Sequence, residues 1–430
     1  MPPPGWPNAA ARVAAMSLAR QAAAKPRRAG PRPLLLHLAA ANQTMLSSLA
    51  ALPSAKLGLL PWRPPLDRRA AALQPSLAAA GPEALPLAVA AAAEGRLRTM
   101  LQGIARYQAH AYRRDLADPP VIWSRGAARL LDYGGGGPAA VTALFVPSLV
   151  NRAYILDLSG RQSLLRWLAR QGVRPLLLDW GLPGPHERGF TLERYIDGPL
   201  AGAVTVAATV AGGPVALVGY CMGGTLAIAA ALRQAEQVGA LALLAAPWDF
   251  HAGSDHGQVL AALRSSLEAL LDELGELPVD LLQALFLALD PGLSLRKFAG
   301  FAGLDPQSAA AEDFVALEDW VNDGVPLTGP VARQCLLGWY GENEPMRGRW
   351  RVGGEPVRPY RLRQPTLVVV PHNDRIVPPA AAAALAGLVP RAESLTPCAG
   401  HIGMVVGGKA LSELWQPLAH WLRRAAAGHG

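Results

Sequence analysis

The segment LVGYCMGGTLAIAA, from Leu217 to Ala230, places a cysteine in a glycine-rich turn between an apolar run and a helix-forming run. Its centre, GYCMG (219–223), matches the pattern in which glycines stand two residues before and two residues after a nucleophile. Such a strand-to-helix turn strains the backbone of the nucleophile, and bulkier neighbours would clash. The segment predicts a strand, a sharp turn with Cys221 at its tip, and a helix. A small buried cysteine in a crowded turn is the alternative interpretation.

The predicted turn also gives the cysteine a reactive environment. It points the Cys221 sulfur above a sheet at a helix N-terminus, where the helix macrodipole favours the thiolate. The next amide, Met222 N–H, can face an oxyanion. A second donor is expected from the loop PSLVNR (147–152), which follows another apolar strand, and Val150 is the candidate. The pattern therefore predicts an oxyanion hole made of two backbone amides.

A nucleophile of this kind needs a base and a carboxylate that orients the base, in the chain order nucleophile, acid, histidine. The segment LVVVPHNDRIVPP offers Asp374 just after a predicted strand, and LTPCAGHIGMVVGG offers His401 after the last one. Alone, Asp374 also fits a turn residue and His401 a structural histidine. Their order after Cys221 favours a Cys-His-Asp triad over three unrelated structural residues.

The rest of the chain alternates strands with helices. Strands are predicted at 141–147, 174–180, 214–220, 239–247, 365–372 and 392–399, with helical patterns between them. This alternation predicts an α/β fold: a mostly parallel sheet with helices on both faces. We expect a basic, Pro/Ala-rich, flexible extension with a few short helices (1–85), a first part of the core (86–250), an inserted helical cap (251–345) and a second part of the core (346–430).

Composition and charge exclude several classes of protein. The chain has 430 residues, of which 51% are hydrophobic and 6% aromatic, as in a globular protein. No acidic residue precedes Asp67, so much of the net charge of +8 lies in the N-terminal segment. No zinc-finger spacing or aromatic-basic RNA signature is present, which argues against nucleic-acid binding. The nine histidines are scattered and match no metal-site spacing, so no metal is expected.

Three cysteines in a chain of this length indicate free thiols in a reducing compartment, and hence a cytoplasmic protein. Cys335 and Cys398 are predicted to be core residues. The run from Pro199 to Leu232 contains no charged residue, as a membrane span would, but glycines and a proline interrupt it. It is therefore predicted to be a helix, a strand and a second helix in the core, with no transmembrane segment.

Several motifs occur together and in order: LVNRAYILDL, LLLDWGLP, GYCMGG, LEDWVNDG, NDRIVPP and GHIGMVVGGKA. Together they resemble the polyhydroxyalkanoate synthases, most closely the shorter class III type and related synthase-like proteins. The resemblance spans roughly Tyr112 to Leu422 and implies an α/β-hydrolase core with a helical cap. It implies these roles: nucleophile Cys221, acid Asp374, base His401, oxyanion amides Val150 and Met222, and a family tryptophan, a candidate for the substrate pocket, at Trp320.

The resemblance also implies a reaction. The acyl group of a 3-hydroxyacyl-CoA passes to Cys221 with release of CoA, and a hydroxyl activated by His401 then attacks the acyl-enzyme to extend a polyester. The CoA thioester is a substrate, and no cofactor is implied. The implied partners are the growing polyester chain or granule surface and a second copy or second synthase subunit. Two departures stand out: family members usually have His where this chain has Arg375, and a long basic extension is unexpected in the short class.

Two other functions remain open on sequence alone. One is a cysteine hydrolase, an esterase or thioesterase that does not polymerise, on the same scaffold. The other is a granule-associated binding protein with a decayed site. The presence of Cys221, Asp374 and His401 argues against the second.

Overall fold

The computed structural model describes residues 28–62, 64, 66–135, 137, 141–253 and 256–427. The chain forms two compact units: unit 1 contains Met1–Tyr112 and Pro291–Val315, and unit 2 contains Arg113–Asp290 and Ala316–Gly430. Unit 1 thus combines the predicted extension, the helix after it and part of the predicted cap. Residues 1–27 of that extension lie outside the described part of the chain.

Unit 2 is built on an eight-stranded sheet with the strand order β1-β2-β4-β3-β5-β6-β11-β12. The strands β1, β2 and β4 pair antiparallel, and the rest of the sheet is parallel, so the predicted mostly parallel sheet is confirmed. The strands are β1 (Val121–Arg125), β2 (Ala128–Asp132), β3 (Val141–Val146), β4 (Val173–Asp179), β5 (Val215–Tyr220), β6 (Val238–Leu244), β11 (Thr366–Val369) and β12 (Ala392–Leu395).

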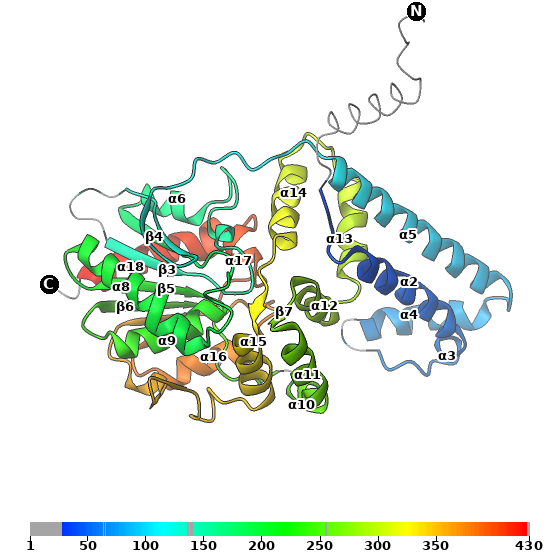
Figure 1. Cartoon of the computed structure of the whole chain (residues 1–430). Helices are drawn as coiled ribbons and strands as arrows, with labels where there is room; N and C mark the ends of the chain where they lie inside the picture. Colours follow the sequence, from blue (N-terminus) through cyan, green and yellow to red (C-terminus); the bar gives the residue numbers. More distant parts are fainter. Residues whose placement is uncertain are drawn as a thin grey trace, which may run out of the picture. The chain divides into compact units, whose positions relative to one another are not determined.

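Helices cover both faces of this sheet, and Figure 1 shows α9 on the near face and α18 on the far face. The helices of unit 2 outside the inserted block are α6 (Leu164–Ala169), α7 (Leu192–Tyr195), α8 (Ala201–Ala211), α9 (Met222–Arg233), α16 (Pro379–Leu388), α17 (Gly403–Val406) and α18 (Gln416–Ala427), with the short helices η1 (Ala153–Leu156), η2 (Ile196–Leu200), η4 (Pro359–Arg361) and η5 (Leu411–Trp415). A small hairpin joins β9 (Arg351–Val352) to β10 (Glu355–Pro356).

The uncharged run 199–232 forms the centre of the core. Every residue of β5 is buried, and ten residues of α9 are buried as well. Because the strand has neighbours on both edges and the helix lies against the sheet, neither element exposes a face that needs charge. No helix in the described part of the chain is long and apolar enough to cross a membrane.

The inserted block, residues 256–341, is mostly helical, as expected. It contains α10 (His256–Ala262), α11 (Arg264–Leu274), α12 (Val279–Leu289), α13 (Leu293–Ala302), α14 (Ala309–Asn322), α15 (Gly329–Arg333) and η3 (Gln334–Gly341). A short antiparallel pair, β7 (Glu276–Leu277) and β8 (Leu327–Thr328), was not expected. The chain leaves unit 2 after Asp290 and returns at Ala316, so α13 belongs to unit 1.

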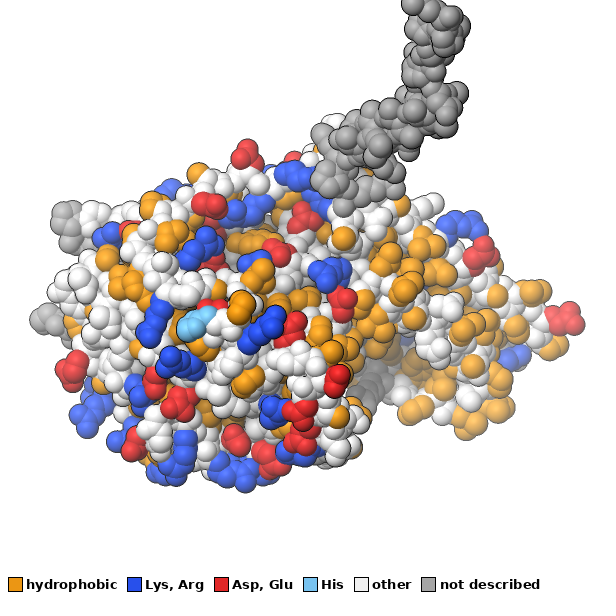
Figure 2. Space-filling model, in the orientation of Figure 1, with side chains coloured by type: hydrophobic (Ala, Val, Ile, Leu, Met, Phe, Trp, Pro, Cys, Tyr) orange, Lys and Arg blue, Asp and Glu red, His pale blue; other side chains and the backbone are white. Residues whose placement is uncertain are grey.

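Unit 1 is helical, and its helices extend into the predicted extension. They are α2 (Leu34–Ala50), α3 (Leu52–Lys56), α4 (Leu66–Ala79), α5 (Ala84–Ala109), α13 and the first part of α14, residues 309–315. Helices α5 and α13 are so close that a Cβ on Gly103 would lie 1.9 Å from the Phe298 carbonyl oxygen. The unit also exposes many leucines, and Figure 2 shows hydrophobic side chains gathered on its visible face. The exposed leucines are Leu34, Leu35, Leu46, Leu57, Leu59, Leu66, Leu73, Leu87, Leu101 and Leu293.

Candidate active site

Cys221 occupies the sharp turn between β5 and α9. Its backbone angles are φ 56° and ψ −129°, a conformation that is strained for a residue with a side chain. Two hydrogen bonds hold the turn: the Cys221 amide donates to the Leu244 carbonyl at 2.8 Å, and the Cys221 carbonyl accepts from Gly224 N–H at 2.9 Å. The structure thus has the strand, strained turn and helix that the sequence predicted.

The glycines around Cys221 are required by close packing. A Cβ on Gly219 would lie 2.4 Å from the Cα of Gly224. A Cβ on Gly223 would lie 2.1 Å from the carbonyl oxygen of Val146, at the end of β3. Both distances are far below van der Waals contact, and the opposing atoms are backbone. The N-terminus of α9 can therefore approach β3 only when these positions lack side chains.

The structure brings Cys221, His401 and Asp374 together. Asp374 follows β11 and His401 follows β12, and these strands run parallel to β5, so their carboxyl ends lie at one edge of the sheet. His401 Nδ1 lies 2.7 Å from Asp374 Oδ2, and the His401 side chain is close enough to Cys221 for the two to interact electrostatically. Asp374 and His401 are both buried, whereas Cys221 is half-buried.

Backbone groups hold the carboxylate and the imidazole in place. Asp374 Oδ1 accepts hydrogen bonds from the amides of Ile376 and Val377, each at 2.9 Å. The Tyr220 hydroxyl donates to the His401 carbonyl at 3.1 Å, and the two rings stack with centroids 5.2 Å apart. Tyr220 therefore fixes His401, a contact that the sequence pattern did not reveal.

The pKa values of three side chains at the site are raised. Burial acts to lower the pKa of His401, but the charge of Cys221 and the hydrogen bonds to Asp374 and Cys221 outweigh it and raise the pKa to about 10. Burial, together with the charges of Cys221 and Asp374, raises the pKa of Tyr220 well above its usual value. The pKa of Tyr340 is raised in the same way, by burial first. Tyr340 thus belongs to the surroundings of the thiol, and no signal in the sequence indicated this.

The two predicted oxyanion amides differ in their hydrogen-bond acceptors. Met222 is the first residue of α9, so its N–H has no acceptor within the helix. Val150 N–H donates to the Ser148 hydroxyl oxygen at 3.1 Å. An oxyanion at Val150 would therefore replace the Ser148 oxygen as the acceptor.

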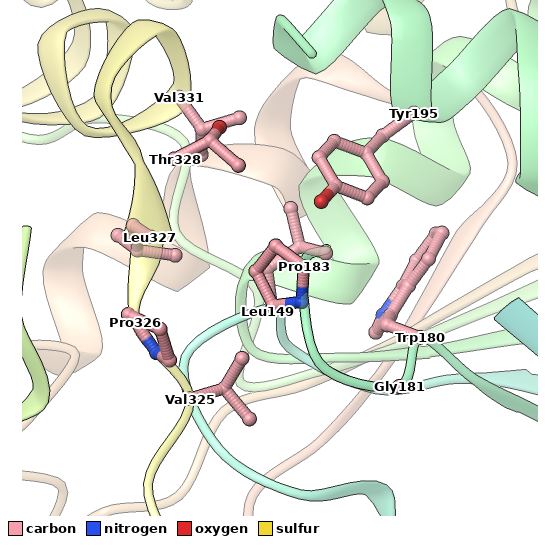
Figure 3. A pocket seen from close by; sticks show the side chains of 10 residues that line it. All are labelled: Leu149, Trp180, Gly181, Pro183, Tyr195, Val325, Pro326, Leu327, Thr328 and Val331. Carbon is pink, nitrogen blue, oxygen red and sulfur yellow. The ribbon is translucent and has the colours of Figure 1, made fainter. Parts of the chain in front are cut away.

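Trp320 contacts the loop 147–152, which the sequence predicted to supply an oxyanion amide. Its side chain is buried, and its indole N–H donates to the Arg152 carbonyl at 2.8 Å. Figure 3 shows a pocket next to this loop, with the Tyr195 hydroxyl directed toward its interior and without Trp320 in its lining. The lining residues are Leu149, Trp180, Gly181, Pro183, Tyr195, Val325, Pro326, Leu327, Thr328 and Val331.

The remaining residues noted in the sequence lie outside the contacts that join Cys221, His401 and Asp374. Arg375 forms a salt bridge with Asp290, at the end of α12, with an Nη1–Oδ2 distance of 2.7 Å.

Cys335 is buried, as predicted, and burial raises the pKa of its thiol. The prediction for Cys398 was wrong: it is exposed, because it lies in the loop after β12 rather than in the strand. The described residues contain no group of three potential metal ligands.

Comparison with known proteins finds one matching family model and several relatives. Residues 162–407 match the model of the alpha/beta hydrolase fold family. The chain is 31% identical over 295 residues to the poly(3-hydroxyalkanoate) polymerase subunit PhaC of Synechocystis sp., covering 66% of this chain and 78% of the relative. It is 30% identical over 299 residues to the subunit of the same name from Allochromatium vinosum, covering 68% and 83%. Among solved structures, a monoacylglycerol lipase from Paleococcus ferrophilus covers 69% of this chain and 99% of its own, at 14% identity and a TM-score of 0.43.

Proposed function

Because this chain belongs to the poly(3-hydroxyalkanoate) polymerase family, with an α/β-hydrolase fold, we propose that it is an acyltransferase that polymerises 3-hydroxyacyl-CoA through a thioester on Cys221. The observation that carries the proposal is the strained Cys221 within hydrogen-bonding reach of a histidine that is itself bonded to a buried carboxylate. A nucleophile, a base and an orienting group in this arrangement can perform acyl transfer.

In the first half-reaction, the Cys221 thiolate attacks the thioester carbonyl of the substrate. The amides of Met222 and Val150 stabilise the tetrahedral oxyanion. The bond to the CoA sulfur then breaks, and the CoA thiolate takes a proton from the His401 imidazolium. Since one thioester replaces another, the acyl group remains activated.

In the second half-reaction, a hydroxyl group attacks the acyl-enzyme. His401 accepts the hydroxyl proton while the oxygen forms an ester bond, and the Cys221 thiolate leaves. Asp374 holds the imidazole by its Nδ1 side, and Tyr220 holds its backbone, so the ring keeps one position through both steps. Exclusion of water by the inserted helical block would let the hydroxyl compete with water.

The proposed partners are the CoA thioester, the polyester chain and a protein subunit. Both relatives described above are named as polymerase subunits, which supports a second copy of this chain or a second synthase subunit as a partner. The exposed leucines of unit 1 form the kind of apolar surface that contacts another apolar phase, which supports attachment of a cytoplasmic protein to polyester granules. Sedimentation of the purified chain with and without polymer particles tests both points.

The reaction is tested by incubating the purified chain with 3-hydroxybutyryl-CoA and with longer 3-hydroxyacyl-CoA substrates. CoA release is followed together with the turbidity of the polymer. We expect both signals from the native chain, neither from Cys221→Ala, and both from Cys398→Ala, which removes an exposed thiol. CoA release without polymer would indicate a cysteine hydrolase instead. Unchanged activity in Cys221→Ala would exclude both enzymes.

A further inference from the structure

The oxyanion loop, residues 147–152, is tied to one segment of the inserted block. This segment, residues 320–325, comprises the end of α14 and the turn after it, and we call it the strap. Val325 N–H donates to the Val150 carbonyl at 3.1 Å, and Asn151 and Gly324 form an antiparallel bridge. The backbones of the strap and the loop are therefore joined by an isolated antiparallel β-bridge.

Side chains reinforce this pairing. The Trp320 indole N–H donates to the Arg152 carbonyl at 2.8 Å, and Trp320 is only 5% exposed. Asp323 Oδ1 lies 3.5 Å from Arg152 Nε. Because the Asp323 side chain is 48% exposed, this ion pair contributes little, whereas the buried indole bond is shielded from water. Trp320 is thus the main side-chain contact between strap and loop.

The other end of the loop is fixed to the core. The Trp180 indole N–H donates to the Pro147 carbonyl at 3.0 Å. The backbone of Gly223, in the turn of the nucleophile, approaches the carbonyl oxygens of Val146 and Pro147 without room for a Cβ. The Val150 amide therefore lies between an anchored end and an end whose carbonyls are held by the strap.

We infer that Trp320 is a positioning residue, which holds the second half of the oxyanion loop so that Val150 N–H faces the developing oxyanion. The inference rests on the proposed function, because it assumes that an acyl thioester reacts at Cys221. It replaces the expected role of Trp320 in a substrate pocket. A displacement of the strap would also displace the oxyanion loop, so the inserted block controls whether Val150 N–H can donate to the oxyanion.

The expected loss of acylation rate can be estimated from the contribution of one hydrogen-bond donor, Val150 N–H, to the oxyanion hole. Loss of one oxyanion-hole donor lowers a rate by about 10²- to 10³-fold, and a misplaced donor loses part of that. Trp320→Phe keeps a large aromatic ring in the buried site but removes the N–H that holds the Arg152 carbonyl. We expect it to slow acylation by about 10- to 100-fold.

The test compares two reactions of the same thiol. Acylation by 3-hydroxybutyryl-CoA, measured as the CoA burst, builds an oxyanion, whereas alkylation by iodoacetamide does not. We expect Trp320→Phe to slow acylation and to leave the alkylation rate of Cys221 unchanged. Trp421→Phe is the matched control, because it removes an indole bond to Glu393 at 3.0 Å, and both of its rates should be normal.

Two results would overturn the inference: a normal acylation rate in Trp320→Phe, or an equal loss of acylation and alkylation, which would indicate a general structural role. If Trp320→Phe does not fold, Gly324→Ala displaces the strap instead, because its Cβ would lie 2.6 Å from Val279 Cγ1, and a selective loss of acylation is again required. The proposed function fails on a different result, namely acylation that persists in Cys221→Ala.

Discussion

Asp374→Asn tests the geometry of the site most directly, because the substitution keeps the shape of the side chain and replaces one acceptor oxygen by an NH₂ donor. In the native chain, Asp374 Oδ1 accepts two backbone amides at 2.9 Å and Oδ2 accepts His401 Nδ1 at 2.7 Å. An asparagine can offer its oxygen to the two amides, but its NH₂ group then faces Nδ1. His401 must turn Nδ1 into an acceptor and carry its proton on Nε2, so it can no longer take a proton from Cys221.

The expected loss of rate is large and the expected loss of stability is small. The same exchange in a Ser-His-Asp triad, where it traps the wrong tautomer, costs about 10⁴ in kcat, and we expect about 10³- to 10⁴-fold here. Asp374→Asn retains the two backbone hydrogen bonds, whereas Asp374→Ala leaves two amide donors unpaired at about 1–3 kcal/mol each. The two variants should therefore share the loss of activity but differ in their free energy of unfolding.

The pH dependence of stability gives a second readout. The folded-state pKa of His401, about 10, lies above its ordinary value of 6.5. Its contribution to stability is therefore complete below pH 6.5 and is lost as the pH rises toward 10. Urea unfolding of the native chain should show this decline, and Asp374→Asn should show a shallower one, because a hydrogen bond and a charge that raise the pKa are gone.

The assay is stopped-flow measurement of CoA release from 3-hydroxybutyryl-CoA, with folding checked by circular dichroism. Asp132→Asn is the matched control, since Asp132 also accepts a backbone amide, from Gly134 at 2.8 Å, and pairs with Arg174. It should keep native activity. A folded Asp374→Asn that releases CoA within tenfold of the native rate would refute the assignment of Asp374 as the group that orients His401.

Three further predictions concern the surroundings of the triad. Cys221→Ala removes a charge that raises the pKa of His401, so this pKa should fall toward 6.5 in an NMR titration, and an unchanged pKa would contradict an electrostatic interaction between the two side chains. Gly223→Ala should destabilise the fold by about 1–3 kcal/mol or more and abolish activity, because its Cβ meets backbone at 2.1 Å, whereas Gly213→Ala, in open space, should be tolerated in thermal melts. Arg375→Ala breaks a salt bridge whose arginine is 75% exposed, so it should change the free energy of unfolding by less than about 1 kcal/mol; a larger loss in urea unfolding would show that α12 depends on it.

The sequence alone determined the elements that follow from local pattern. The spacing around Cys221 predicted the strand, turn and helix, since only glycines allow the close approach of α9 to the backbone of β3. The alternation of strands and helices predicted a mostly parallel sheet, and the order of Asp374 and His401 after late strands predicted that they meet Cys221 at one edge. These features depend on residues that are near one another in the chain or on the regular direction of parallel strands.

The tertiary structure alone decided the contacts that join distant segments. The pairing of the strap with the oxyanion loop connects residues about 170 positions apart. Trp320 donates to a backbone carbonyl, and because every residue has one, the sequence does not show which residue is the acceptor. The division of the inserted block between two units depends on long-range helix packing, because α13 packs against α5, which lies about 190 positions earlier in the chain. Local pattern specifies what each segment becomes, but the partners of its backbone groups are set only when the whole chain packs.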